Sequence, residues 1–315
     1  MGGAVIHVYH ERAARIRDAI LALEPGRTVV GLCTPDELAV ALPELDVLFA
    51  GLPPRTGWAE ATRLRLLQLM GAGADGLLPS PDLPAHTVIA GARGVFATEV
   101  SEHALALVLA SCRALPTLFA RQAERVWRQF ETGTLAGETM CVVGLGEVGR
   151  RVARAAAALD MRVLGVRKHP EPVAYVERVV GPDRLGEVLR ESRWVVLALP
   201  LTAETKRLID ARALAELPER AVVVNVGRAG VVDEGALAAA LASGRLGGAA
   251  LDVLDDEPLP PESPWWTAPN TIVTPHVAGV GRNYVQRVIE VLLDNVARLD
   301  AGEPLAHLID RERGY

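Results

Sequence analysis

Cysteine is scarce in this sequence, and the cysteines that are present lie far apart. The 315 residues include only 3 cysteines, Cys33, Cys112 and Cys141, and none of them forms a Cys-x-x-Cys pair. An odd number of widely spaced cysteines excludes a disulfide framework and a zinc ribbon. We therefore predict reduced thiols and a cytoplasmic location.

Excess positive charge and long apolar runs are also missing. The 33 Lys and Arg against 39 Asp and Glu give a formal net charge of −6, which provides no basic field to attract nucleic acid. The N-terminus lacks a basic stretch followed by an apolar one, and apolar runs such as residues 104–110 are far shorter than a membrane span. We therefore expect neither nucleic acid nor a membrane as a partner.

The length and composition indicate two folded domains. Hydrophobic residues make up 50% of the chain and charged residues 23%, which excludes a disordered or low-complexity protein. A chain of 315 residues suits two domains of roughly 100 to 200 residues each.

Short β-rich runs alternate with stretches of helical period, which is typical of parallel sheets built from βαβ units. The first series predicts strands at residues 5–9, 28–32, 46–50, 66–70 and 87–90. The second predicts six strands, at residues 139–143, 162–166, 194–199, 221–226, 248–251 and 271–274. An apolar helix is expected between the two series at 101–115, and an amphipathic helix after them at 284–299.

These two series predict an α/β fold with two doubly wound parallel-sheet domains. Because no strand follows residues 284–299, we expect this helix to pack back on the first domain. The smaller, flavodoxin-like domain then comprises residues 1–97 and 282–315. The second domain, residues 98–281, is inserted in it, and a ligand is expected in the cleft between the domains.

A glycine-rich loop follows the first strand of the second series. Residues 139–153 read TMCVVGLGEVGRRVA, which places a GxGxxG motif between an apolar strand and an Ala-rich helix. The first glycine permits a tight turn, the second lets the backbone approach a pyrophosphate, and the third lets helix and strand pack. The alternative is a turn without a ligand. We predict dinucleotide binding by Gly144, Leu145, Gly146, Glu147, Val148 and Gly149. Residues 98–281 are then a Rossmann dinucleotide-binding domain, and residues 1–97 and 282–315 are the substrate domain.

The second strand of this series ends in cations. Most such folds have an Asp or Glu there, which accepts hydrogen bonds from the adenine ribose hydroxyls of NAD. Here Arg167 and Lys168 follow residues 162–166, and two cations would attract the 2′-phosphate of NADP. We therefore predict NADPH, with NADH as the alternative cofactor. The competing interpretation is a solvated charged loop that happens to follow a strand.

Five spaced motifs resemble those of the D-isomer-specific 2-hydroxyacid dehydrogenases, and the resemblance covers nearly the whole chain. They occur in the family's order and spacing: LAGETMCVVGLGEVG at 135–149, LPLTAET at 199–205, NVGRAGVVDE at 225–234, LDVLDDEP at 251–258 and TPH at 274–276. The resemblance implies hydride transfer between the nicotinamide C4 and the C2 of a 2-oxo or 2-hydroxy acid.

By this resemblance, three side chains carry the chemistry. His276 is the general acid that protonates the ketone oxygen, Glu257 orients its imidazole, and Arg228 holds the substrate's carbonyl and carboxylate. A histidine titrates near neutrality, a carboxylate favours its protonated form, and a guanidinium is a planar fork for a carboxylate. Each taken singly could be an ordinary surface or loop residue, but together they favour a site. The family commonly has Gly where this chain has Ala229.

Further roles follow from the same resemblance. Asp252 resembles the aspartate that accepts a hydrogen bond from the nicotinamide carboxamide. Ala72 and Gly73 match a loop whose backbone N–H groups bind the substrate carboxylate, although a simple strand-ending turn is the alternative. HExxH is absent and the histidines show no paired ligand spacing, so we expect no metal. The cofactor site is expected to include Leu199, Pro200, Thr205, Val226 and Gly227.

The sequence therefore predicts an NADPH-preferring reductase of a small 2-oxo acid, with glyoxylate and hydroxypyruvate as the substrate class. One alternative is a 3-phosphoglycerate dehydrogenase-like enzyme. It is disfavoured because the chain ends at Tyr315 without a regulatory domain. The other is a dinucleotide-sensing scaffold of the corepressor type, disfavoured because the three catalytic residue types are present.

An aromatic segment suggests self-association. Residues 121–136, with Gln122, Trp127 and Phe130, lie where the family has a dimerisation arm. Exposed aromatic residues suit an interface, so we predict a homodimer. The alternative is a helix packed on its own chain, because aromatic residues serve cores equally well.

Overall fold

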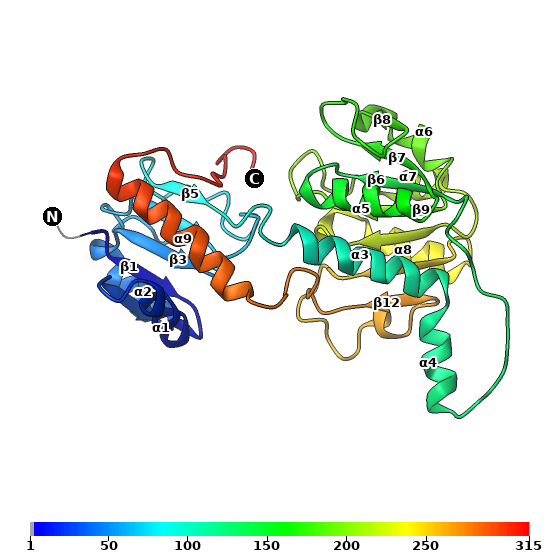
Figure 1. The fold of residues 1–315 in the computed structure, drawn as a ribbon, viewed down its shortest axis with the longest axis horizontal. Helices are drawn as coiled ribbons and strands as arrows, with labels where there is room; N and C mark the ends of the chain where they lie inside the picture. The colour runs from blue at the N-terminus through cyan, green and yellow to red at the C-terminus, as the bar shows by residue number, and fades with distance from the viewer. Residues whose placement is uncertain (1–2, 315) are drawn as a thin grey trace. The chain divides into compact units, whose positions relative to one another are not determined.

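Two parallel sheets organise the chain in the computed structural model, which describes residues 3–314. The chain divides into two compact units. The first comprises the described residues up to Phe96 and those from Arg282 onward, and the second is Ala97–Gly281. The sequence interpretation placed these boundaries at residues 97 and 281. Figure 1 shows that both ends of the chain belong to the first unit.

The first unit contains a five-stranded sheet in the order β2-β1-β3-β4-β5, with all neighbouring strands parallel. This is the strand order of a flavodoxin-like doubly wound sheet. Its strands are β1 (Ile6–Tyr9), β2 (Val29–Leu32), β3 (Val47–Ala50), β4 (Leu66–Leu69) and β5 (Val88–Ala90). Its helices are α1 (Ala13–Leu23), α2 (Pro35–Ala41) and α9 (Tyr284–Ala301), with a 3-10 turn at Leu42–Glu44.

Helix α9 packs on this first sheet through a buried face that includes Val288 and Leu292. On the same face, the Asn295 side-chain amide donates to Gln68 Oε1 on β4 at 2.8 Å, and both side chains are fully buried. An unsatisfied buried polar group costs about 1–3 kcal/mol. The pair therefore fixes how the C-terminal helix sits on the sheet formed by the N-terminal part of the chain.

The second unit contains a seven-stranded parallel sheet in the order β12-β11-β10-β9-β6-β7-β8. The direction of the crossovers reverses between β6 and β9, and open α/β sheets bind ligands beyond the carboxyl ends of the strands at such a point. The strands are β6 (Thr139–Val143), β7 (Arg162–Val166), β8 (Arg178–Val180), β9 (Trp194–Leu197), β10 (Val222–Asn225), β11 (Gly248–Leu251) and β12 (Thr271–Val273).

The helices of the second unit are α3 (Ala97–Cys112), α4 (Leu115–Ala123), α5 (Glu147–Ala158), α6 (Leu185–Leu189), α7 (Ala211–Glu216) and α8 (Glu234–Ala242). Of these, α4 has no buried residue and extends away from the sheet (Figure 1). Short 3-10 turns occur at Pro182–Arg184, Ala229–Val231 and Pro264–Thr267. The fold class predicted from the sequence, two parallel-sheet α/β domains, is confirmed.

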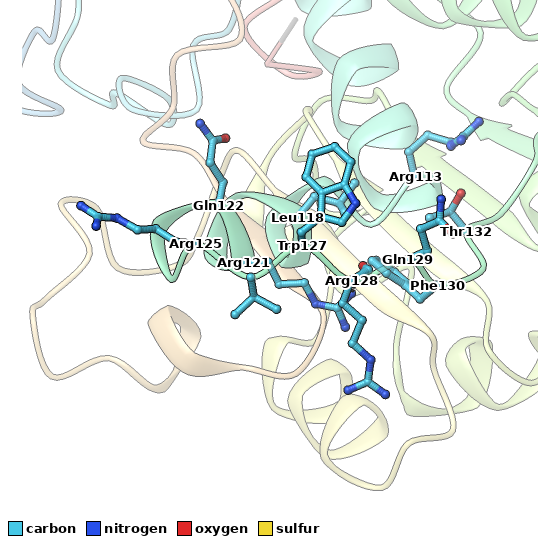
Figure 2. A pocket seen from close by; sticks show the side chains of 11 residues that line it. Arg113, Leu118, Arg121, Gln122, Arg125, Trp127, Arg128, Gln129, Phe130 and Thr132 are labelled. Atoms are coloured by element: carbon cyan, nitrogen blue, oxygen red, sulfur yellow. Dashed lines mark hydrogen bonds between the residues drawn. The ribbon is translucent and has the colours of Figure 1, made fainter.

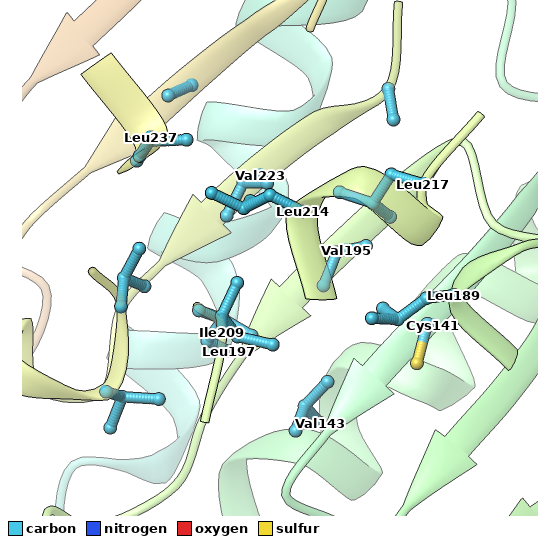
Figure 3. Close-up of a cluster of buried hydrophobic side chains, with 14 of the residues drawn as sticks. Cys141, Val143, Leu189, Val195, Leu197, Ile209, Leu214, Leu217, Val223 and Leu237 are labelled. Carbon is cyan, nitrogen blue, oxygen red and sulfur yellow. The ribbon is translucent and has the colours of Figure 1, made fainter. Parts of the chain in front are cut away.

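Both faces of the second sheet are buried. Along β6, Cys141 and Val143 belong to one hydrophobic cluster, part of which is drawn in Figure 3, and Met140 and Val142 belong to another. Strands covered on both faces by helices have such continuous apolar runs. Burial raises the pKa of the Cys141 thiol to about 12, and all three cysteines are free.

The prediction of six strands in the second sheet was wrong, because β8 adds a seventh. This strand is three residues long, lies at the edge of the sheet and pairs with β7. Two of its residues are only partly buried. The strand begins at Arg178 and only its last two residues are apolar, so no continuous apolar run marks it in the sequence.

The helix predicted at 101–115 is two helices. Helix α3 begins earlier, at Ala97, and ends at Cys112. Ala114 then adopts a left-handed φ of 51°, and Pro116 lies in the first turn of α4. Among residues 3–314 no single helix is long and apolar enough to cross a membrane; α3 and α4 would meet the criteria of length and composition only as a pair, and they are bent by 68°.

Candidate active site

His276 and Glu257 lie side by side beyond the ends of two neighbouring strands. Glu257 follows β11, His276 follows β12, and these strands pair in parallel. His276 Nδ1 is 2.7 Å from Glu257 Oε2, and the Leu254 backbone N–H donates to Glu257 Oε1 at 3.1 Å. Because the carboxylate holds Nδ1, Nε2 is the nitrogen that can exchange a proton with a substrate.

The backbone of His276 is strained. Its φ of 50° lies in the left-handed region, which costs a non-glycine residue about 1–3 kcal/mol and persists only where the surroundings enforce it. Its N–H donates to the Asp252 carbonyl at 2.9 Å. The side chain is 49% exposed, so the imidazole is held in place and still accessible to a ligand.

Arg228 follows β10, the strand on the other side of β11. Asn225, buried at the end of β10, braces its loop: the Asn225 amide donates to the Arg228 carbonyl at 2.9 Å and accepts from the Gly227 N–H at 3.1 Å. Ala229 begins a 3-10 turn without a positive φ, so the loop does not need the glycine found in the family. Arg228, Glu257 and His276 thus follow three adjacent parallel strands at one edge of the sheet.

The side chain of Asp252 is almost fully buried and bound by the protein. Its Oδ1 accepts from the Thr274 hydroxyl at 2.5 Å and from the Val277 N–H at 3.0 Å, and its Oδ2 accepts from the Ala278 N–H at 2.9 Å. These contacts hold the segment that carries His276. The predicted hydrogen bond from a nicotinamide carboxamide to Asp252 stays a prediction.

The glycine loop has the shape that a dinucleotide requires. Gly144 has φ of 97°, and a Cβ there would lie 2.5 Å from the Ala198 carbonyl oxygen. A Cβ on Gly149 would lie 1.9 Å from the Gly144 carbonyl oxygen, so both positions exclude a side chain. A Cβ on Gly146, in contrast, would meet no atom within 4 Å. The open space at Gly146, beside the N-terminus of α5, fits a pyrophosphate.

The loops after β9 and β10 lie against this glycine loop. A Cβ on Gly144 would be 2.9 Å from Leu199 Cβ, and one on Gly227 would be 2.8 Å from the Leu199 carbonyl oxygen. Thr205 Oγ1 donates to the Pro200 carbonyl at 2.6 Å, which shapes the loop after β9. Close backbone packing therefore brings together five of the residues predicted to line the cofactor.

Four other residues predicted to bind the cofactor could contact it through their backbone atoms. The side chains of Leu145 and Val226 are buried in the core, so only their backbone can face a ligand. Glu147 and Val148 form the first turn of α5. The N–H groups in the first turn of a helix have no partner within the helix and favour an anion.

Arg167 and Lys168 follow β7 and are paired with carboxylates. Arg167 forms an ion pair with Glu171, and Lys168 Nζ donates to Glu204 at 2.7 Å. Arg150, which directly follows the glycine loop, lies 3.5 Å from the same Glu171 oxygen. The sequence interpretation missed Arg150, although its place after the last glycine of the motif could have suggested it. Two of the three cations, Arg150 and Arg167, therefore lie at one acidic side chain, Glu171, whereas Lys168 pairs with Glu204.

Ala72 and Gly73 lie in the loop that follows β4, at the carboxyl end of the first sheet. The Gly71 carbonyl accepts from the Ala92 N–H at 2.8 Å, and Ala72 is exposed. The loop is thus anchored at Gly71, and the next residue, Ala72, is accessible to a ligand. Its predicted contact with a substrate carboxylate stays a prediction.

Metal ligands do not gather in the described part of the chain. No group of three or more His, Cys, Asp or Glu side chains within residues 3–314 is arranged to hold a metal ion. The expectation that the reaction uses no metal stays a prediction.

Comparisons with known proteins identify the family of this chain. Residues 105–278 match the family model for the D-isomer specific 2-hydroxyacid dehydrogenase NAD binding domain. Glyoxylate/hydroxypyruvate reductase A of Salmonella paratyphi C is 33% identical over 261 residues, which cover 80% of this chain and 82% of that protein.

Solved structures are similar over the whole chain. A D-isomer specific 2-hydroxyacid dehydrogenase from Xanthobacter autotrophicus Py2, in complex with NADPH and MES, has a TM-score of 0.88 at 32% identity and covers 100% of both chains. An NADPH-dependent glyoxylate/hydroxypyruvate reductase from Sinorhizobium meliloti, in complex with NADP and sulfate, has a TM-score of 0.88 at 29% identity, covering 99% of this chain and 100% of its own. This chain therefore belongs to the family of D-isomer specific 2-hydroxyacid dehydrogenases, which are NAD(P)-dependent oxidoreductases.

Proposed function

We propose that this protein reduces a small 2-oxo acid of the glyoxylate or hydroxypyruvate class to the D-2-hydroxy acid, with NADPH as the hydride donor. The observation that carries the proposal is the 2.7 Å contact between His276 Nδ1 and Glu257 Oε2, with Arg228 beyond the adjacent strand. The names of the relatives from Salmonella and Sinorhizobium support the substrate class.

The protein's own groups supply the proton and hold the substrate. NADPH, when bound, supplies a hydride from its nicotinamide C4 to the substrate C2. His276 Nε2 gives a proton to the ketone oxygen, so hydride and proton together convert the carbonyl to an alcohol. Glu257 stabilises the imidazolium before the transfer, and the Arg228 guanidinium holds the carboxylate and the carbonyl.

A panel of 2-oxo acids assayed with NADPH and with NADH tests this function. We expect oxidation of NADPH with glyoxylate and hydroxypyruvate, at a higher kcat/KM than with NADH. Reduction of 3-phosphohydroxypyruvate as the best reaction would favour a 3-phosphoglycerate dehydrogenase-like enzyme instead. Binding of NADPH without turnover of any 2-oxo acid would favour a dinucleotide-sensing scaffold.

The cofactor preference is proposed to depend on Arg167. Arg167→Asp places a negative charge where the 2′-phosphate is expected, so the ratio of kcat/KM for NADPH to that for NADH should fall by a factor of about 10 to 100. This range corresponds to about 1.5–3 kcal/mol for a lost charge-assisted hydrogen bond. Arg193→Asp, an exposed change before the amino end of β9, is the matched control. An unchanged ratio in the Arg167 variant would contradict the assignment.

A homodimer is proposed from the segment that begins at α4. None of the side chains of α4 is buried, and Trp127 is 98% exposed. The Arg121 guanidinium stacks on Phe130 at 4.2 Å. Trp127, Phe130 and several arginines line a groove (Figure 2). Its volume is about 680 Å³. A helix packed on its own chain would bury one face, so the exposure favours a second copy of the chain as the partner.

Light scattering after size exclusion measures this assembly. The native chain is expected to elute with about twice its monomer mass of 33.6 kDa. Trp127→Glu places a charge in the exposed apolar surface and should shift the protein toward the monomer. Val40→Glu alters another exposed apolar residue, on α2, and should leave the mass unchanged. A monomeric mass for the native chain would contradict the proposed homodimer.

A further inference from the structure

A buried network joins helix α3 to the segment that carries His276. The Asp252 carboxylate accepts the Thr274 hydroxyl at 2.5 Å and the backbone N–H groups of Val277 and Ala278 at 3.0 and 2.9 Å. His103, on α3, reaches the same place from the other side. Its Nε2 is 3.0 Å from Thr274 Oγ1 and 3.4 Å from Asp252 Oδ1.

The number of protons fixes the direction of these hydrogen bonds. The Thr274 hydroxyl has one proton, and an ionised carboxylate can only accept. The proton of Thr274 therefore points to Asp252, and His103 must donate from Nε2 to the Thr274 oxygen. His103 is consequently a donor that holds the hydroxyl in the orientation that serves the carboxylate.

The network acts on the residue whose backbone is strained. His276 has φ of 50° and lies between Thr274, which the network binds by its side chain, and Val277, which it binds by its backbone. Asp252 also accepts the His276 N–H through its carbonyl, at 2.9 Å. A left-handed conformation of a non-glycine residue persists only where its surroundings enforce it. Here the surroundings include His103, a residue distant in sequence from every motif of the site.

We propose that His103 is a positioning residue for His276, acting through Thr274 and Asp252. Because the contacts of His103 are with Thr274 and Asp252, its effect on His276 is on the placement of the general acid. The inference rests on the proposed function, in which His276 supplies the proton. It predicts a defect in turnover and no loss of cofactor binding, because the glycine loop follows a different strand.

The test is a pair of substitutions at His103 assayed with NADPH and the preferred 2-oxo acid. His103→Leu removes the donor at similar size, and kcat should fall on the order of tenfold while the KM for NADPH changes by less than about twofold, as expected for one hydrogen bond of a buried network. His103→Gln keeps an N–H near the position of Nε2, so it should restore kcat to within about threefold of the native value. Glu102→Gln, an exposed change on the same helix, should leave kcat unchanged.

The outcomes separate this inference from the proposed function. A native kcat in His103→Leu overturns the positioning role, and so does an equal loss in both His103 variants accompanied by a lower melting temperature, which would show a purely structural role. His276→Ala is measured in parallel. If that variant keeps native turnover, the proposed function fails, whatever the His103 variants do. A large loss in His276→Ala with native His103→Leu refutes the positioning role alone.

Discussion

His276→Ala is expected to lower kcat for reduction of the 2-oxo acid by about 10² to 10⁴, the usual contribution of a positioned general acid. Without the imidazole, no other group at this edge of the sheet is proposed to protonate the ketone oxygen. Binding of NADPH should persist, because the glycine loop follows β6 whereas His276 follows β12. Steady-state kinetics and a fluorescence titration of NADPH measure the two quantities separately.

The control for this substitution is another exposed histidine. His86 lies in the first unit, between β4 and β5, and His86→Ala should retain native turnover. If His276→Ala stays within about threefold of the native kcat, far below the range expected of a general acid, the assignment of the acid is wrong. Loss of NADPH binding in the same variant would instead indicate a damaged fold.

Gly146→Ala is expected to separate cofactor binding from folding. Gly146 has φ of −80°, which any residue adopts, and a Cβ there would meet no atom within 4 Å. The free energy of unfolding should therefore stay the same or rise by about 0.4–1 kcal/mol, since alanine restricts the unfolded chain. The added methyl group enters the space proposed for the pyrophosphate, and overpacking of about 1–3 kcal/mol raises the KM for NADPH by about 5- to 150-fold.

Gly149→Ala provides the contrast. Its Cβ would lie 1.9 Å from the Gly144 carbonyl oxygen, a clash within the protein itself. The free energy of unfolding should fall by about 1–3 kcal/mol or more, with or without NADPH. Chemical denaturation of both variants, together with NADPH titration, checks the pair. If Gly146→Ala binds NADPH like the native protein, the pyrophosphate does not lie against this loop.

The strands of both sheets could be predicted from the sequence because their signal is local. A buried parallel strand is a continuous apolar run, and the strands β6 and β7 begin and end at the predicted residues. β8 was not predicted, since it begins at Arg178 and has only two apolar residues, and it pairs with β7 at the edge of the sheet. The break between α3 and α4 was missed for a related reason: Ala114 favours helix by itself, yet it adopts a left-handed conformation there.

The site shows the same division between local and tertiary signals. His276 and Glu257 can be paired from the sequence, because each stands in a motif that resembles the family's, and their contact of 2.7 Å agrees with that pairing. The sequence interpretation missed Asn225, His103 and Arg150 as supporting residues. His103 contacts a hydroxyl and a carboxylate that only the folded chain brings within reach, whereas Arg150 directly follows the last glycine of the motif, a place that could have suggested it.

The most direct measurement of the central claim follows the hydride. NADPH that carries deuterium at the transferring C4 position is incubated with the protein and hydroxypyruvate, and the product is analysed by NMR and chiral chromatography. The account predicts D-glycerate with one deuterium at C2. Product without deuterium, product of the L configuration, or oxidation of NADPH without a 2-hydroxy acid would contradict it.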